Sequence, residues 1–193
     1  VMSLVSINGL PATSTTTVSP GEEIEYSIKI LNEGTDAINN AQIRIEIPYM
    51  ATFVNGSQSG IINFSPLPTP NNLYFNPAIG ASGALIWDIG TLPVPASPSD
   101  VLGELKYKIK ITEDCFLLKN QFCIPSTSLQ GFINGVGALT GIPITNQPFI
   151  QGYVTSGLCI GDPITDPISV SIDATNYISQ NCQNENPMAV RSF

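Results

Sequence analysis

Two stretches of this sequence alternate apolar and polar residues, and they constrain the fold more than any other feature. GEEIEYSIKI places apolar side chains on every second position from Ile24 to Ile30, and GELKYKIKIT does so from Leu105 to Ile111. A period of two is the pattern of a β-strand with one buried face. Each stretch therefore predicts a strand whose isoleucine, leucine and tyrosine side chains face a core.

The charges on the two stretches predict that these strands are antiparallel neighbours. The predicted opposite residues are Glu23 and Lys110, Glu25 and Lys108, Ser27 and Lys106, and Lys29 and Glu104. The same register places Ile24 beside Ile109, Tyr26 beside Tyr107, and Ile28 beside Leu105. All three charged pairs are then opposite in sign, and such pairs contribute roughly 0.2–1 kcal/mol each. The alternative is that each stripe is a solvated face. In both cases the charges set register and solubility and carry no chemistry.

The rest of the chain also favours β-structure. Gly and Pro number 16 each, only 11% of residues are charged, and no convincing helix of three turns is present. Further short strands are predicted at 4–10, 41–48, 51–55, 60–64, 72–75, 84–92, 126–139, 147–155 and 167–175, with a one-turn helix allowed near DCFLLKN. Trp87 is expected in the core. This spacing predicts an all-β sandwich of about eight to ten antiparallel strands.

The four cysteines predict disulfides in an oxidising compartment. No C-x-x-C pair and no histidine is present, so a zinc site is disfavoured. Because CFLLKNQFC can fold back as a short loop, we favour Cys115–Cys123, which leaves Cys159–Cys182. The alternative is four reduced cysteines that pack as small apolar residues.

The charge balance excludes several classes of function. The net charge is −8, and seven Lys and Arg residues cannot build a large basic surface for nucleic acid. The absence of histidine removes the commonest general base, no G-x-S-x-G motif occurs, and we expect no enzyme. No apolar run approaches the roughly 20 residues that span a bilayer. No signal peptide is visible, and because the chain opens on Val1 we expect an excised piece of a longer protein.

The order of these pieces resembles a known family. Pro20-Gly21, the strand bearing Tyr26, the NEG turn, Pro48, the strand WDIGTL and the alternating strand 103–112 occur in sequence. This pattern is similar to the repeat domain, of long-uncharacterised function, of large bacterial surface proteins. The resemblance covers residues 13–112 and implies an immunoglobulin-like or transthyretin-like sandwich. FIQGYVTSGLCIGDPITDPI resembles, more loosely, domains of gliding-associated Bacteroidetes adhesins exported by type IX secretion.

The predicted organisation is a single β-sandwich domain over 1–182. Residues 13–112 form its family-like part, 113–182 are a cysteine-bearing extension, and 183–193 are a tail or linker. The long proline-bearing loop at 51–83 and the extra strands of the extension depart from the family pattern.

Four aromatic residues are the candidate ligand contacts. Tyr49, Phe53, Tyr74 and Phe75 lie in or beside the irregular region 49–83, and exposed aromatic rings would suit a carbohydrate-binding module. The competing interpretation, which we prefer, is that these rings cap one end of the sandwich.

No cofactor is expected, although a structural calcium ion is the most plausible inorganic ligand because its ligands are oxygens. Asp114, Asp162 and Asp166 lie near loops, without EF-hand spacing. As a catalytic carboxylate, Asp88 beside Trp87 is a better candidate than the glutamates on the solvent faces of strands, but we prefer the interpretation that it is a polar group at a strand end.

The sequence therefore predicts a structural or adhesive module of a large extracellular or cell-surface protein. It would act as a rigid stalk or a partner-binding unit. Its expected partners are neighbouring domains of the same chain, and surface glycans or other proteins. Carbohydrate binding is the alternative.

Overall fold

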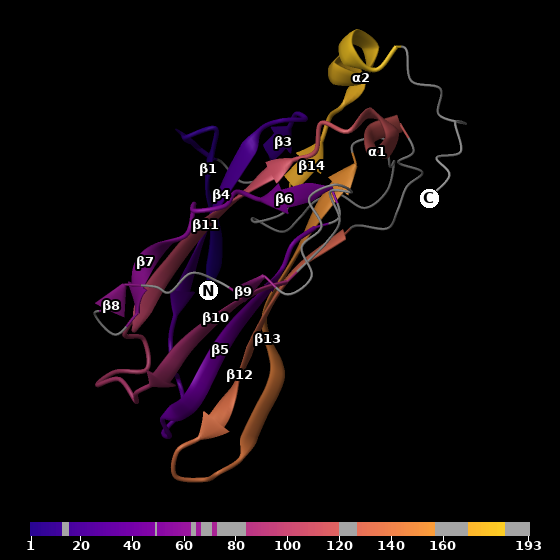
Figure 1. The fold of residues 1–193 in the computed structure, drawn as a ribbon. Helices are drawn as coiled ribbons and strands as arrows, with labels where there is room; N and C mark the ends of the chain where they lie inside the picture. Colours follow the sequence, from indigo (N-terminus) through magenta and orange to yellow (C-terminus); the bar gives the residue numbers. More distant parts are fainter. Residues whose placement is uncertain are drawn as a thin grey trace.

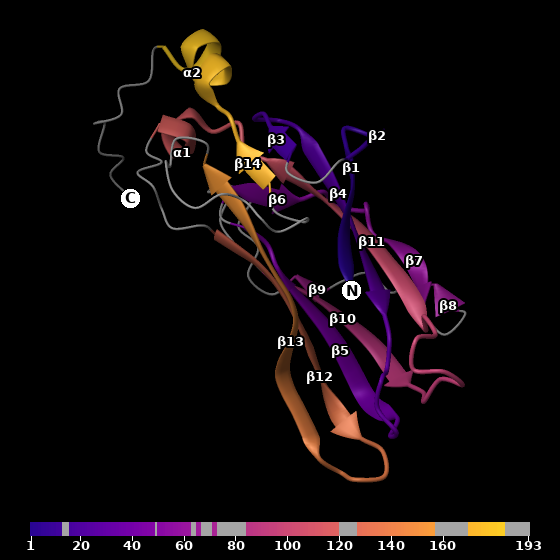
Figure 2. The ribbon, with the colours of Figure 1, turned by 180° about the vertical axis from the view of Figure 1, so that it is seen from behind.

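The computed structural model describes residues 1–12, 16–48, 50–62, 65–66, 71–72, 84–119, 127–156 and 170–183, which form two facing β-sheets and two short helices (Figures 1 and 2). The first sheet has the order β2-β1-β4-β11-β7-β8, with β6 also paired to β11. Its strands are β1 Met2–Ile7, β2 Leu10–Pro11, β4 Glu23–Ile30, β6 Ala51–Phe53, β7 Ser59–Ile62, β8 Ser65–Pro66 and β11 Gly103–Ile111.

The second sheet has the order β3-β14-β13-β12-β5-β10-β9. Its strands are β3 Thr16–Val18, β5 Ile38–Glu46, β9 Asn71–Asn72, β10 Ala84–Leu92, β12 Thr127–Gly137, β13 Pro143–Ser156 and β14 Val170–Ile172. The helices are α1 Cys115–Lys119 and α2 Thr175–Asn181, and both lie at one end of the sandwich (Figure 1). The prediction of an all-β sandwich is confirmed.

The predicted register between the two alternating strands is confirmed at every position. β4 and β11 pair antiparallel, with Glu23 opposite Lys110, Glu25 opposite Lys108 and Lys29 opposite Glu104. On the other face Tyr26 lies opposite Tyr107. The apolar side chains of both strands are buried, because a period of two places them all on the side that faces the second sheet.

Three aromatic rings lie at the centre of the core. Tyr26, Trp87 and Tyr107 are fully buried. The Tyr107 ring centroid lies 5.8 Å from that of Tyr26 on β4 and 6.1 Å from that of Trp87 on β10. The expectation that Trp87 is a core residue is confirmed, and its contact with Tyr107 joins the two sheets.

Several predicted boundaries are wrong, most of them toward the C-terminus. Of the predicted strand 167–175, residues 170–172 form β14, and α2, which was not predicted, begins at Thr175. Residues 167–169 lie outside the described residues. β14 also pairs parallel with both β13 and β3, so the sandwich is not wholly antiparallel. The physical reason is that β14 enters between two strands that already run in one direction. The described residues also contain more strands than the eight to ten predicted, because several two- and three-residue strands carry no periodic signal.

The cysteine-bearing part of the chain contributes directly to the second sheet. β12 lies between β13 and β5, so strands from residues 113–182 and from residues 13–112 share one ladder. The one-turn helix near DCFLLKN is present as α1.

Candidate functional site

The charged stripe on β4 and β11 contains one ion pair between the strands, and this pair is diagonal to the register. Lys108 Nζ lies 3.4 Å from Glu23 Oε2, although Glu25 is the residue directly opposite Lys108. Glu25 instead accepts a hydrogen bond from Ser6 Oγ of β1 at 2.9 Å, and Glu104 accepts one from Ser27 Oγ at 2.5 Å. These groups are partly exposed and bonded to their sheet neighbours. The stripe is therefore a scaffold that ties β1, β4 and β11 together.

A disulfide joins the end of β11 to the C-terminal helix. Cys115 begins α1, four residues after β11 ends, and its sulfur is bonded to Cys182, which follows α2. The two Cα atoms are 5.4 Å apart, a normal separation for a disulfide. The bond closes a loop with a sequence separation of 67 residues, which includes β12, β13 and β14. We call this bond and the two helices it joins the latch.

Hydrogen bonds reinforce the latch around the disulfide. Lys119 Nζ of α1 donates to the carbonyl oxygen of Cys182, and Tyr177 Oη of α2 donates to the carbonyl oxygen of Glu113 at 3.4 Å. Asp114 Oδ1 accepts from the backbone N–H of Phe116 at 2.8 Å, as a helix N-cap does. Cys182 is fully buried. The two helices are thus joined by hydrogen bonds as well as by the covalent bond.

The segment between β11 and α1 is fixed to the sheet. The backbone N–H of Gly21 donates to the carbonyl oxygen of Ile111 at 3.1 Å. Lys110 Nζ lies 2.7 Å from Glu113 Oε2, and this hydrogen bond and the negative charge of Glu113 raise the pKa of Lys110 above its usual value. Gly21 has a φ of +86°, and a Cβ there would lie 2.9 Å from Glu113 Oε1. The positive φ favours glycine at this turn, and the end of the Glu113 side chain occupies the space where a Cβ would lie.

The favoured disulfide pairing is wrong. Cys115 bonds to Cys182, so neither Cys115–Cys123 nor Cys159–Cys182 can form in this state. The reason is tertiary: β14 carries the chain back to the end of the sandwich where β11 ends, and α2 then places Cys182 against α1. Cys123 and Cys159 lie outside the residues that the structure describes.

One of the four predicted ligand-contact aromatics lies among the described residues. Phe53 lies on β6, is partly buried and packs against the hydrophobic core. Tyr49, Tyr74 and Phe75 lie outside the described residues.

The candidate carboxylates have local structural roles. Asp88 is exposed and accepts a hydrogen bond from Gln42 Nε2 at 2.6 Å, across the ladder between β10 and β5. Asp114 caps α1, and Asp162 and Asp166 lie outside the described residues. Within the described ranges, no group of three or more His, Cys, Asp or Glu residues is placed to hold a metal ion.

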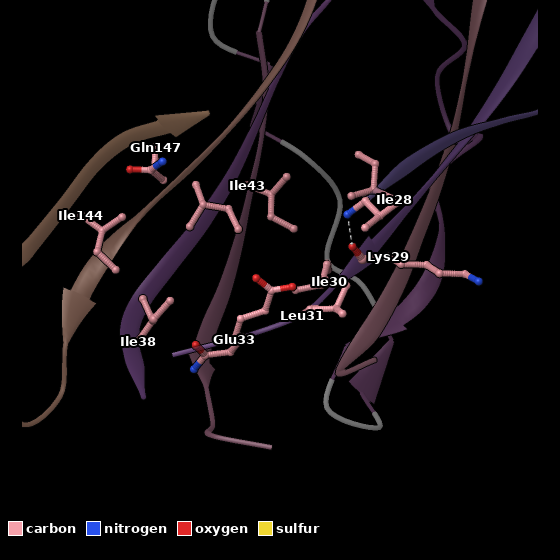
Figure 3. A pocket seen from close by; sticks show the side chains of 12 residues that line it. Ile28, Lys29, Ile30, Leu31, Glu33, Ile38, Ile43, Ile144 and Gln147 are labelled. Carbon is pink, nitrogen blue, oxygen red and sulfur yellow. Dashed lines mark hydrogen bonds between the residues drawn. The ribbon is translucent and has the colours of Figure 1, made fainter. Parts of the chain in front are cut away.

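A cavity of about 400 Å³ lies between the two sheets, below the N-terminal strand (Figure 3). Its walls are largely isoleucine side chains: Ile28 and Ile30 of β4, Ile38 and Ile43 of β5, Ile133 of β12 and Ile144 of β13. Its polar boundary includes Lys29, Glu33 and the amino group of Val1, which donates to the carbonyl oxygen of Lys29 at 2.7 Å. Partial burial lowers the pKa of that amino group, against an opposing effect of Glu33. The cavity is suited to apolar groups.

In the part of the chain that the structure describes, no helix is both long and apolar enough to cross a membrane.

Comparisons with known proteins find similar solved structures only. No family model matches the sequence, and no curated protein matches it. The structure is similar to BcpA, the major pilin subunit of Bacillus cereus, with a TM-score of 0.40, 10% identity, and coverage of 74% of this chain and 36% of that one. It is similar to the T6 backbone pilin of Streptococcus pyogenes serotype M6, with a TM-score of 0.40, 11% identity, and coverage of 77% and 32%.

A third similar structure is a cohesin module from a Clostridium perfringens family 33 glycoside hydrolase, with a TM-score of 0.36, 9% identity, and coverage of 89% and 96%. The chain thus spans about a third of each pilin subunit but nearly the whole of the cohesin module. With these identities and TM-scores, the likenesses concern the sandwich alone and assign no activity, substrate or partner to this chain.

Proposed function

We propose that this chain is a structural module of an extracellular protein at the bacterial cell surface, and that it carries tension along its length. The observation that supports this proposal is the Cys115–Cys182 bond, which ties the C-terminal end of the described chain to the end of β11. A disulfide suits an oxidising compartment, and an acidic surface suits an extracellular one. The comparisons with pilin subunits are compatible with such a role and add no weight of their own.

The path of force through the sheet follows from the strand directions. β1 and β11 both pair antiparallel with β4, and Met2 lies beside Ile28 while Lys110 lies beside Glu23. The start of β1 and the end of β11 therefore point to opposite ends of the sheet. A pull on both would slide β1 and β11 in opposite directions along β4. The inter-strand hydrogen bonds are perpendicular to such a pull and share it, so that many must break together.

The latch determines which part of the chain meets the force. A pull that arrives after Cys182 crosses the disulfide to Cys115 and enters β11, and the residues between the two cysteines stay outside the path. Without the bond, the same pull would reach α2 and then β14, whose ladders to β13 and β3 are three residue pairs long. The bond thus diverts tension from a short ladder to the long β1–β4–β11 ladder.

Stretching single molecules held at their two ends tests this function. The oxidised protein should resist until one high-force event, whereas the double variant Cys115→Ser with Cys182→Ser should first release its C-terminal strands at lower force. Identical force traces for the two proteins would contradict the proposal.

Adhesion, membership in a gliding-type adhesin and type IX export remain predictions of the sequence resemblance. Binding of a structural calcium ion remains a prediction from the aspartates near loops. The coding sequence on either side of this chain would test the first three, through further repeats and a C-terminal sorting domain. Carbohydrate binding by the aromatics near 49–83 would be tested on a glycan array, with Tyr74→Ala as the variant.

A further inference from the structure

Three Asn-Gly dipeptides occur in this chain, and the structure places them in different surroundings. They are Asn8-Gly9, Asn55-Gly56 and Asn134-Gly135. In such a dipeptide the backbone nitrogen of the glycine can attack the side-chain amide carbon of the asparagine, because glycine has no Cβ to hinder the approach. The reaction needs an asparagine side chain that is free to move and a glycine whose backbone can rotate. These two conditions separate the three sites.

Asn8 is held at both polar atoms of its side-chain amide. Asn8 and Gly9 form the two-residue turn between β1 and β2, with φ of 49° and 77°, as in a type I′ hairpin. Asn8 Nδ2 donates to Glu22 Oε1 at 3.1 Å, and the backbone N–H of Glu23 donates to Asn8 Oδ1 at 2.9 Å. Reaction at Asn8 would first have to break both of these bonds.

Asn134 and Gly135 are held inside the second sheet. Both lie on β12, which pairs with β5 on one side and with β13 on the other, and Asn134 lies opposite Gln42. The space beside Gly135 is filled, because a Cβ there would lie 2.4 Å from Ile38 Cγ2 and 3.1 Å from the carbonyl oxygen of Asn39. The backbone at this site therefore cannot rotate without separating strands of the ladder.

Asn55 and Gly56 meet both conditions. They form an exposed turn between β6 and β7, closed by a hydrogen bond from the backbone N–H of Ser57 to the carbonyl oxygen of Val54 at 3.1 Å. Gly56 has a φ of +79°, as at the third residue of a type II turn, and nothing lies within 4 Å of the place where a Cβ would be. Among the described residues, neither the Asn55 side-chain amide nor the Gly56 N–H has a hydrogen-bond partner.

We propose that Asn55-Gly56 is a self-modification site, at which the chain converts Asn55 to isoaspartate or aspartate with water as the only co-reactant. The Gly56 nitrogen bonds to Cγ of Asn55, its hydrogen and the side-chain nitrogen leave as ammonia, and a succinimide ring forms. Water then opens the ring. Attack at the backbone carbonyl gives isoaspartate, in which the chain runs through the side chain, and attack at the side-chain carbonyl gives aspartate. No group is oxidised or reduced, and both products add one negative charge.

This modification should loosen the cover over one edge of β11. β6 pairs with residues 109–111 of β11 and β7 with residues 103–106, so Lys108 lies between them and faces the turn (Figure 1). The backbone N–H of Val54 donates to the carbonyl oxygen of Lys108 at 3.0 Å, and the backbone N–H of Lys108 donates to Ser57 Oγ at 2.9 Å. We expect isoaspartate, which adds a methylene group to the backbone of the turn, to break these two bonds.

Peptide mapping of the full chain, incubated at mildly alkaline pH and then reduced, tests the proposal. Trypsin cuts after Lys and Arg and so separates the three sites into peptides 1–29, 45–106 and 120–191. In the folded protein, Asn55 should convert more than about tenfold faster than Asn8 and Asn134, because those two sites react only after local opening. In protein that is reduced and unfolded in urea before incubation, all three sites should convert at similar rates, because the dipeptide is the same.

Asn55→Gln is the matched variant, because its longer side chain would have to close a larger ring, and peptide 45–106 should then stay unmodified at this position. In the modified wild-type protein, the backbone amide of Lys108 should exchange its hydrogen at least about tenfold faster than before incubation, whereas in Asn55→Gln its exchange should not change. A folded protein that keeps Asn55 intact while the unfolded protein loses it, or equal rates at the three sites in the folded protein, would overturn the proposal. Isoaspartate at this position with unchanged exchange at Lys108 would overturn the loosening of β11.

Discussion

The Nζ of Lys108 lies 3.4 Å from Oε2 of Glu23, which is the diagonal neighbour of Lys108 on β4. The residue directly opposite Lys108 is Glu25. The mirrored charges therefore predict which strands pair and in which register, whereas the ion pair between the two strands forms between diagonal neighbours. Glu25 and Glu104 each lie directly opposite a lysine, but they accept hydrogen bonds from Ser6 and Ser27 instead.

This diagonal pair should show a small, measurable coupling. We expect a double-mutant cycle of Glu23→Gln and Lys108→Gln to give about 0.2–1 kcal/mol, because both side chains are partly exposed. Urea unfolding of the four proteins measures it. A control cycle of Glu23 with Lys106, two residue pairs further along the ladder, should give a value near zero. A larger coupling in the control than in the test pair would refute the diagonal assignment.

Tyr107 should tolerate the loss of its hydroxyl group. The ring is fully buried, and among the described residues neither its hydroxyl nor the indole Nε1 of Trp87 has a hydrogen-bond partner. Burial and the neighbouring Tyr26 raise the pKa of Tyr107 well above its usual value of 10.0. We expect Tyr107→Phe to leave the free energy of unfolding unchanged or to increase it, because it removes an unsatisfied buried group.

Tyr26→Phe is a related variant at the ring next to Tyr107. If Tyr107→Phe instead lowers the free energy of unfolding by more than about 1 kcal/mol, the Tyr107 hydroxyl has a bonding partner that this account lacks.

The Asp36 carboxylate accepts hydrogen bonds from the backbone N–H groups of Leu139 and Thr140 and from the Thr140 hydroxyl, and this clamp on the turn between β12 and β13 should open in acid. Partial desolvation raises the pKa of the Asp36 carboxyl, but hydrogen bonds from Thr140 and Leu139 outweigh it and leave the pKa below its usual value of 3.8. A depressed carboxyl pKa stabilises the fold above the unfolded-state pKa, and the stabilisation is lost as the pH falls through the folded-state value. The amide resonances of Leu139 and Thr140 should therefore shift together below about pH 4. Unchanged resonances down to pH 2, or the same transition in Asp36→Ala, would contradict the clamp.

Peptide mapping without reduction should recover Cys115 linked to Cys182. With that pair formed, any second intramolecular bond must join Cys123 to Cys159, the two remaining cysteines. Cys115→Ser with Cys182→Ser should lower the free energy of unfolding by about 4 kcal/mol in the chain-entropy model, because the closed loop is long. A peptide that links Cys115 to Cys123 would restore the pairing first favoured from the sequence.

The sheet and the latch differ in how far the sequence predicts them. The register between β4 and β11 follows from the alternation of apolar and charged residues in each strand, so it could be predicted pair by pair. The Cys115–Cys182 bond depends on where β14 and α2 bring the chain. A strand was predicted at β14 but not its place in the sheet, and α2 was not predicted. The short segment CFLLKNQFC favoured a local bond between Cys115 and Cys123, but the fold brings Cys182 to Cys115 instead. The cavity also escaped prediction, because its lining comes from β4 of one sheet and from β5, β12 and β13 of the other, and no local pattern shows which strands face one another.

The extension gained on reduction tests the central claim most directly. Molecules held at their two ends should unfold without releasing the loop between Cys115 and Cys182 while the bond is intact. With all thiols reduced, the fully stretched length should increase by roughly 220–240 Å, which is the sequence separation of 67 residues at about 3.3–3.6 Å each. A reduced and an oxidised molecule of equal extended length would contradict the account, because no bond would then close the loop between Cys115 and Cys182.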